Sequence, residues 1–78
     1  MSEAITSSVA AEVAAEVRAE LARQRKPQRQ LGEVIGLSQT AAWRRLKGDI
    51  PFDVAELDKI ADWLGVPLAN FFPERSAA

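Results

Sequence analysis

The 78-residue sequence has no cysteine and no histidine. Without cysteine there are no disulfide bonds, and without either residue the usual zinc and iron–sulfur sites are excluded. The common nucleophile–base pairs built on cysteine or histidine are excluded as well, and no glycine-rich phosphate loop is present. We therefore expect a protein that is not an enzyme and that holds no metal or cofactor.

Long apolar runs are also absent. No run approaches the roughly 20 residues that span a bilayer, and the opening residues MSEAITSS lack the basic flank of a signal peptide. We expect a cytoplasmic protein without a membrane partner. A chain this short forms one small domain, so its stability depends on tight helix packing or on a second subunit.

The net charge of −1 conceals an uneven distribution of charges. Residues 1–17 carry three acids and no base, residues 18–47 carry eight bases and two acids, and residues 48–78 carry six acids and two bases. A basic middle between acidic ends indicates one surface that binds a polyanion and another that avoids it. The alternative is a mixed surface that is simply solvated.

Glycine and proline residues divide the chain into about five predicted helices. Ser7 or Ser8 is placed to cap the first helix, Asp53 and Glu56 form a capping-box pair on the fourth, and Gly65 ends the fourth. The single domain is expected to span residues 1–78, with frayed ends at 1–8 and 74–78. The predicted helices are Val9–Arg25, Gln28–Ile35, a third between Ser38 and Gly48, a fourth after Asp53, and a short last one in PLANFF.

Apolar residues at helical spacing predict the core. The stripe on the first helix and the pair Phe71–Phe72 are alternative candidates for a dimer interface, and Trp63 is expected to be partly buried. The predicted inner residues are Val9, Val13, Val17 and Leu21, then Leu31, Val34 and Ile35, then Val54, Leu57, Ile60, Ala61 and Leu64, and finally Leu68 with one or both of Phe71 and Phe72.

The stretch QRQLGEVIGLSQTAAWRRLK, residues 28–47, has the pattern of a helix-turn-helix. Gly32 is expected to let the two helices approach closely, and Gly36 to make the turn. On the second of these helices, Gln39, Thr40, Trp43, Arg44 and Lys47 share one face. Glutamine can read adenine and arginine can read guanine in the major groove, so this face is a candidate for DNA recognition.

These motifs continue into a longer match. The stretch LGEVIGLSQTAAWRRLKGDIPFDVAELDKIADWLGVPLANFF resembles the lambda-repressor-like helix-turn-helix family, also called XRE/Cro. The resemblance covers Gln28 to Phe72 and implies an all-α, compact bundle of about five helices. It implies contacts to bases or backbone from Ser38, Gln39, Thr40, Trp43 and Arg44, and phosphate contacts from Gln28 and Lys47.

The basic run around Pro27 adds Lys26 and Arg29 as candidate phosphate contacts, although bases at a helix C-terminus also favour the helix dipole. Two residues depart from the commonest pattern of the family. Arg45 stands where an apolar residue is usual, and Trp43 stands where a small or polar one is usual. For Trp43 three interpretations remain, core, DNA contact or protein contact, and the helix geometry favours an exposed or half-exposed ring.

We therefore expect a sequence-specific DNA-binding regulator in a bacterial or phage-infected cell. The expected partner is double-stranded DNA, bound by a homodimer on a palindromic operator. The resemblance suggests a short phage or prophage repressor. The alternative is a protein-interaction module, like an antitoxin, that contacts another protein through Trp43 or through the acidic fourth helix.

Overall fold

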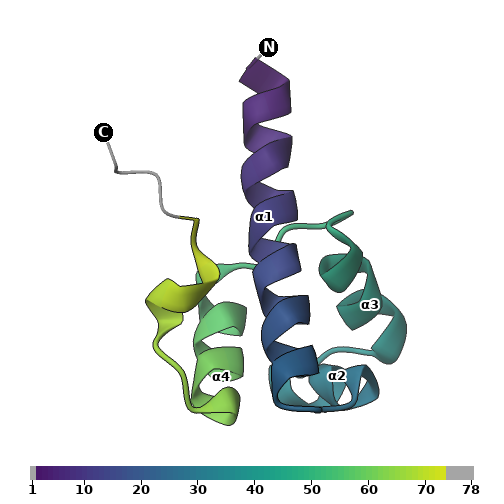
Figure 1. The fold of residues 1–78 in the computed structure, drawn as a ribbon. Helices are drawn as coiled ribbons and strands as arrows, with labels where there is room; N and C mark the ends of the chain where they lie inside the picture. The colour runs from purple at the N-terminus through teal and green to yellow at the C-terminus, as the bar shows by residue number, and fades with distance from the viewer. Residues whose placement is uncertain (1, 74–78) are drawn as a thin grey trace.

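Helices account for all the regular structure between Ser2 and Phe71 (Figure 1). The computed structural model describes the backbone of residues 2–73 and the side chains of residues 9–73. Within that range there is no strand, so the predicted all-α class is confirmed. The elements are α1 (Ser2–Arg23), the 3₁₀ helix η1 (Gln28–Gln30), α2 (Leu31–Ile35), α3 (Gln39–Lys47), α4 (Val54–Leu64) and the 3₁₀ helix η2 (Leu68–Phe71).

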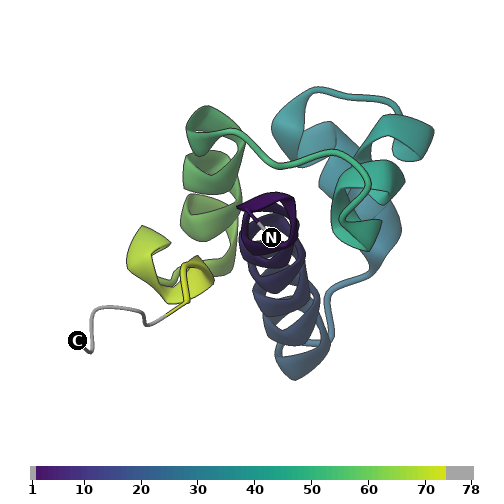
Figure 2. The same cartoon turned by 90° about the horizontal axis from the view of Figure 1, so that it is seen from above.

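Helix α1 lies in the middle of the arrangement. Seen along its axis, α2 and α3 lie on one side of it, and α4 and η2 on the other (Figure 2). Contacts join α1 to α3 and to η2, and α2 to α4, so the bundle closes around the C-terminal part of α1. The helix-turn-helix is therefore supported by α1 from one direction and by α4 from another.

One apolar core connects all four α-helices and η2. The residues predicted to face inward are buried at most positions, and Val34 and Leu68 are partly buried against the core. Gln28–Ile35, predicted as one helix, is a 3₁₀ turn followed by α2. The buried apolar residues are Val13, Ala14, Val17, Leu21, Leu31, Ile35, Ala42, Leu46, Leu57, Ile60, Ala61, Leu64 and Phe71.

Helix α1 starts earlier than predicted, at Ser2 rather than Val9. Ser7 and Ser8 therefore lie inside the helix, so the predicted N-cap is wrong. The backbone of residues 2–8 is helical, and the fraying of this end stays a prediction. The N-terminal turns extend beyond the rest of the bundle (Figure 1). The sequence of these turns carries no apolar stripe that would have predicted them. The predicted frayed end at 74–78 lies outside the described residues.

Helix α1 ends in a Schellman motif around Arg25. The backbone N–H of Lys26 donates to Leu21 O at 2.9 Å, and that of Arg25 donates to Ala22 O at 3.1 Å. These two bonds satisfy carbonyls that the helix end leaves without partners. They also hold Arg25 at φ 57°, a left-handed conformation that L-residues with a side chain rarely adopt.

Helix α4 begins with the predicted capping box. Asp53 Oδ1 accepts from the backbone N–H of Glu56 at 2.7 Å, and Glu56 Oε1 accepts from the backbone N–H of Asp53 at 3.0 Å. Val54, predicted to face the core, is 64% exposed, so that prediction is wrong. It is the first residue of the helix and lies at the edge of the apolar stripe, where the turn has not yet reached the core.

The last predicted helix is the 3₁₀ helix η2. Of the two neighbouring phenylalanines, Phe71 is buried in the core and Phe72 is 43% exposed. Trp63 is partly buried, as predicted, and Lys26 Nζ lies 5.4 Å from its ring centroid. This cation–π contact joins the end of α1 to α4.

Candidate nucleic-acid interface

Gly32 and Gly36 set the geometry of the helix-turn-helix. A Cβ added at Gly32 would lie 2.7 Å from Leu37 O and 3.3 Å from Ser38 O, so no side chain fits there. The predicted close approach is confirmed, and the nearest atoms belong to the turn that leads into α3. Gly36 takes φ 75°, a left-handed conformation that glycine adopts without a steric penalty.

The N-terminus of α3 is capped as predicted. Ser38 Oγ accepts from the backbone N–H of Ala41 at 3.1 Å, which satisfies one of the free amides of the first turn. Ala42 and Leu46 face the core and are buried. The opposite face, which carries Gln39, Thr40, Trp43, Arg44 and Lys47, is exposed, so the predicted division of α3 into an inner and an outer face is confirmed.

Two arginines hold the C-terminal half of α3 against its neighbours. Arg18, on α1, donates from Nη1 to the carbonyl oxygen of Leu46. Arg45 donates from Nη1 to Ala41 O at 3.1 Å and from Nε to Glu56 Oε1 at 3.0 Å. Because Arg45 points toward α4 and Leu46 into the core, the position that is unusual for the family is occupied by an inter-helix ion pair.

Glu56 therefore has two functions at once. The same oxygen, Oε1, accepts from the backbone of Asp53 in the capping box and from the side chain of Arg45. The start of α4 and the rotation of α3 about its axis are thus linked through one carboxylate. Charge-assisted hydrogen bonds of this kind are stronger than neutral ones.

Trp43 is 53% exposed, so the core interpretation is wrong. Lys47 Nζ lies 4.0 Å from the centroid of the indole ring, and Asp49 Oδ2 lies 3.2 Å from the same nitrogen. An ammonium ion over an indole face is a favourable cation–π arrangement. The ring is therefore covered by a cation on one face, and Lys47, a predicted phosphate contact, already has an acidic partner.

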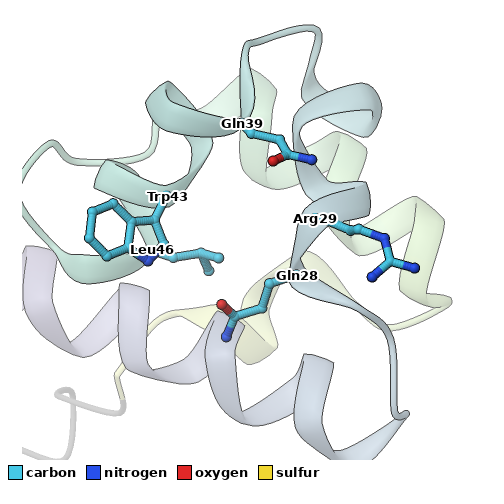
Figure 3. A pocket seen from close by; sticks show the side chains of 5 residues that line it. All are labelled: Gln28, Arg29, Gln39, Trp43 and Leu46. Carbon is cyan, nitrogen blue, oxygen red and sulfur yellow. The ribbon is translucent and has the colours of Figure 1, made fainter.

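A shallow hollow lies between α3 and η1. It is lined by Gln28 and Arg29 from η1 and by Gln39, Trp43 and Leu46 from α3. Gln28 and Gln39 border the opening from different elements, whereas the side chain of Arg29 points away from it (Figure 3). The structure thus brings predicted base-contacting and phosphate-contacting residues to one surface.

The remaining predicted site residues divide into two groups. Ser38, Thr40 and Arg44 are exposed on or beside the outer face of α3. Lys26 is not among the residues that line the hollow, and it lies over Trp63. Its position fits the structural interpretation of the basic run, in which a cation stabilises the end of a helix.

A polar cluster at the end of α1 was not predicted from the sequence. Arg23 Nη2 donates to Glu20 Oε1 at 2.7 Å, and Gln24 Nε2 donates to Glu20 Oε2 and to Leu64 O, each at 2.8 Å. The hydrogen bond from Arg23, followed by that from Gln24, holds the pKa of the Glu20 carboxyl below its ordinary value. The i, i+3 spacing of Glu20 and Arg23 could have predicted their ion pair. No spacing in the sequence indicates the hydrogen bond from Gln24 to Leu64 on α4.

Two other kinds of site receive no support from the part of the chain that the structure describes. Among the side chains of residues 9–73 there is no group of three or more acids that could hold a metal ion. Among the described helices, none combines the length and the apolar character that crossing a membrane requires.

The fold and this surface define a small all-α domain built around a helix-turn-helix with an exposed second helix. The family model of the BetR domain matches residues 6–78, nearly the whole chain, so the protein belongs to the BetR domain family. That domain is associated with regulators of the helix-turn-helix type and with DNA binding. No curated protein and no solved structure matches the chain significantly.

Proposed function

We propose that this BetR domain is a sequence-specific transcriptional regulator of the XRE/Cro type, and that it inserts α3 into the major groove of double-stranded DNA. The observation that carries the proposal is the division of α3. Ala42 and Leu46 are buried, while Gln39, Thr40 and Arg44 stand exposed beyond a capped N-terminus. Gln39 and Arg44 are suited to two-point hydrogen bonds with adenine and guanine.

Phosphate contacts come from residues that flank this helix. Gln28 and Arg29 lie across the hollow from α3, and this arrangement supports phosphate contacts from them beside the groove that α3 enters. Lys47 lies at the other end of α3. Contacts of this kind orient a protein on the duplex, and they make its affinity depend on salt.

A homodimer on a palindromic operator is part of the proposal, because one α3 covers only a few base pairs. The half-site centres are then about 34 Å apart, or a multiple of that distance. The two predicted dimer interfaces, the stripe on α1 and the pair Phe71–Phe72, are partly used by the core of the bundle. Their residues buried there are Val13, Val17, Leu21 and Phe71. An apolar groove remains, lined by Val9, Ala10, Val13, Pro51, Phe52, Leu57 and Phe72.

The test of DNA recognition is fluorescence anisotropy on duplexes enriched from a random pool and on the native upstream region, across a salt series. Arg44→Ala is expected to cost about 1–3 kcal/mol of specific binding free energy and to relax the sequence preference. Lys59→Ala, which removes one exposed charge from α4, is the matched control and should leave both unchanged. Weak binding without salt dependence refutes the proposal.

The test of the dimer is sedimentation velocity with two variants. Phe72→Asp places a charge in the groove and should shift the protein toward the monomer, while Val54→Asp adds the same charge at an exposed apolar residue that does not line the groove. Equal behaviour of the two variants would exclude this groove as the interface.

The alternative function is a protein-interaction module. The exposed indole of Trp43 favours it, because exposed tryptophans are frequent anchors at protein interfaces. In that case Trp43→Ala abolishes binding to the partner protein, and no duplex is enriched from the random pool.

A further inference from the structure

We propose that Trp43 reads the C5-methyl group of a thymine in the DNA half-site, and that Lys47 holds the indole in the orientation for that contact. The inference rests on the proposed function and identifies the base-pair group that Trp43 recognises. It starts from the 53% exposure of the indole. An indole this exposed on a capped, well-anchored helix gains further free energy when a binding partner covers its open face.

The ring is held in place before any DNA arrives. Lys47 Nζ lies 4.0 Å from the ring centroid, and Asp49 Oδ2 holds the same nitrogen at 3.2 Å. The backbone of Asp49 is fixed in turn, because its N–H donates to Arg44 O at 3.0 Å. A side chain restrained in this way loses little conformational entropy on binding.

The same contact restricts what the indole can bind. One ring face is occupied by the ammonium group, so the ring cannot be sandwiched between two unstacked bases. In an intact duplex the faces of the bases are covered by their neighbours, and a side chain in the major groove meets only base edges. The thymine methyl is the apolar group among the edges displayed there.

The position of Trp43 on α3 fits a second contact within the same half-site. It follows Gln39 by one helical turn, about 6 Å along the axis at 1.5 Å per residue, and precedes Arg44 directly. Base pairs are stacked about 3.4 Å apart. For a helix lying along the groove, Trp43 therefore meets a base roughly two steps from the one that Gln39 meets.

The experiment removes one methyl group at a time. A duplex enriched from a random pool is synthesised with deoxyuridine in place of each thymidine, which deletes only the C5-methyl group. At one thymine of the half-site we expect about a fourfold loss of affinity, the effect of one buried methyl-sized group. Placing 5-methylcytosine there, instead of cytosine, should recover a similar factor.

Two protein variants assign this effect to a residue. Trp43→Ala should bind thymine and uracil duplexes equally, so that protein and DNA changes together form a double-mutant cycle. Arg44→Ala, the matched control on the same face, should bind more weakly but keep the uracil penalty. Thermal melting of both variants by circular dichroism shows that they are folded, since both side chains are exposed.

The outcomes separate the inference from the function on which it rests. Salt-dependent, sequence-specific binding without any uracil penalty overturns the inference and leaves the proposed function intact; contact with the sugar–phosphate wall would give this result. A uracil penalty that persists in Trp43→Ala also overturns it. If no duplex is enriched at all, the proposed function fails, and the inference fails with it.

Discussion

Replacing Arg25 by glycine should stabilise the protein. In the described part of the chain, four helices end at a residue in the left-handed conformation. Three of these residues are glycines, Gly36, Gly48 and Gly65, with φ values of 75°, 89° and 69°. At the end of α1 the same role falls to Arg25, at φ 57°. Its Cβ is crowded against the backbone there, whereas glycine has no Cβ.

The size of the effect follows from two opposing contributions. The left-handed conformation costs an L-residue about 1–2 kcal/mol. Glycine removes this cost, but it also makes the unfolded chain more flexible, which lowers the free energy of unfolding by about 0.4–1 kcal/mol. The net stabilisation is then about 1 kcal/mol, which for a domain of this size raises the melting temperature by about 4–8 °C.

The assay is thermal and urea unfolding followed by circular dichroism, with Arg25→Ala as the control. Alanine removes the same side chain and charge but keeps the Cβ, so Arg25→Ala should stay within about 0.5 kcal/mol of the native protein. If Arg25→Gly were no more stable than Arg25→Ala, the left-handed geometry at the end of α1 would not carry the strain assigned to it.

Three further predictions concern the turn, the carboxylate on α1 and the acid beside the interface. Gly32→Ala should destabilise the fold by about 1–3 kcal/mol, because the new Cβ would lie 2.7 Å from the backbone oxygen of Leu37. Glu20→Gln should lower the melting temperature at pH 7 and lower it much less near pH 3, because the pKa of the native carboxyl lies below its ordinary value. Asp49→Asn should tighten DNA binding about two- to fivefold at low salt and steepen the salt dependence, because it removes a negative charge beside the phosphates while the amide oxygen can still accept a hydrogen bond from Lys47.

Each of these predictions has its own control. For the turn, Gly36→Ala separates a backbone-conformation penalty from a clash, since a Cβ there meets nothing within 4 Å. For the carboxylate, the stabilisation by Glu20 is present above the unfolded pKa of about 4.3 and is lost as the pH falls through the lower native pKa. A difference in melting temperature between the native protein and Glu20→Gln that stays constant across pH would contradict this assignment. For the interface, Asp58→Asn on α4 changes the net charge equally, and an equal gain in affinity would show a general charge effect.

Helices α3 and α4 were predictable because their ends are marked locally. Ser38, Gly48, Asp53 and Gly65 stand at the boundaries of α3 and α4, and each marks its boundary through a side-chain cap or a left-handed turn. The exposed position of Trp43 followed from helical periodicity alone. Local signals were sufficient at these four boundaries, where each residue interacts with backbone only a few positions away.

The features that were not predicted have no local mark in the sequence. The early start of α1 carries no apolar pattern. The bonds from Arg18 to Leu46 and from Arg45 to Glu56 join residues 28 and 11 positions apart. Spacing in the sequence gives no sign of such partners, which are set only when the helices pack. The base and phosphate contacts on the outer face of α3 remain predictions.

The nine-residue length of α3 has a consequence for how binding can be measured. A helix this short is unstable in isolation, so the DNA-reading surface exists only while α1 and α4 hold it. A duplex that binds that surface binds the native chain and not the unfolded one. It therefore raises the free energy of unfolding by RT ln(1 + [L]/Kd), and the melting temperature rises with it. A panel of duplexes can then be ranked by affinity from the melting temperature of the protein, because the whole domain unfolds cooperatively.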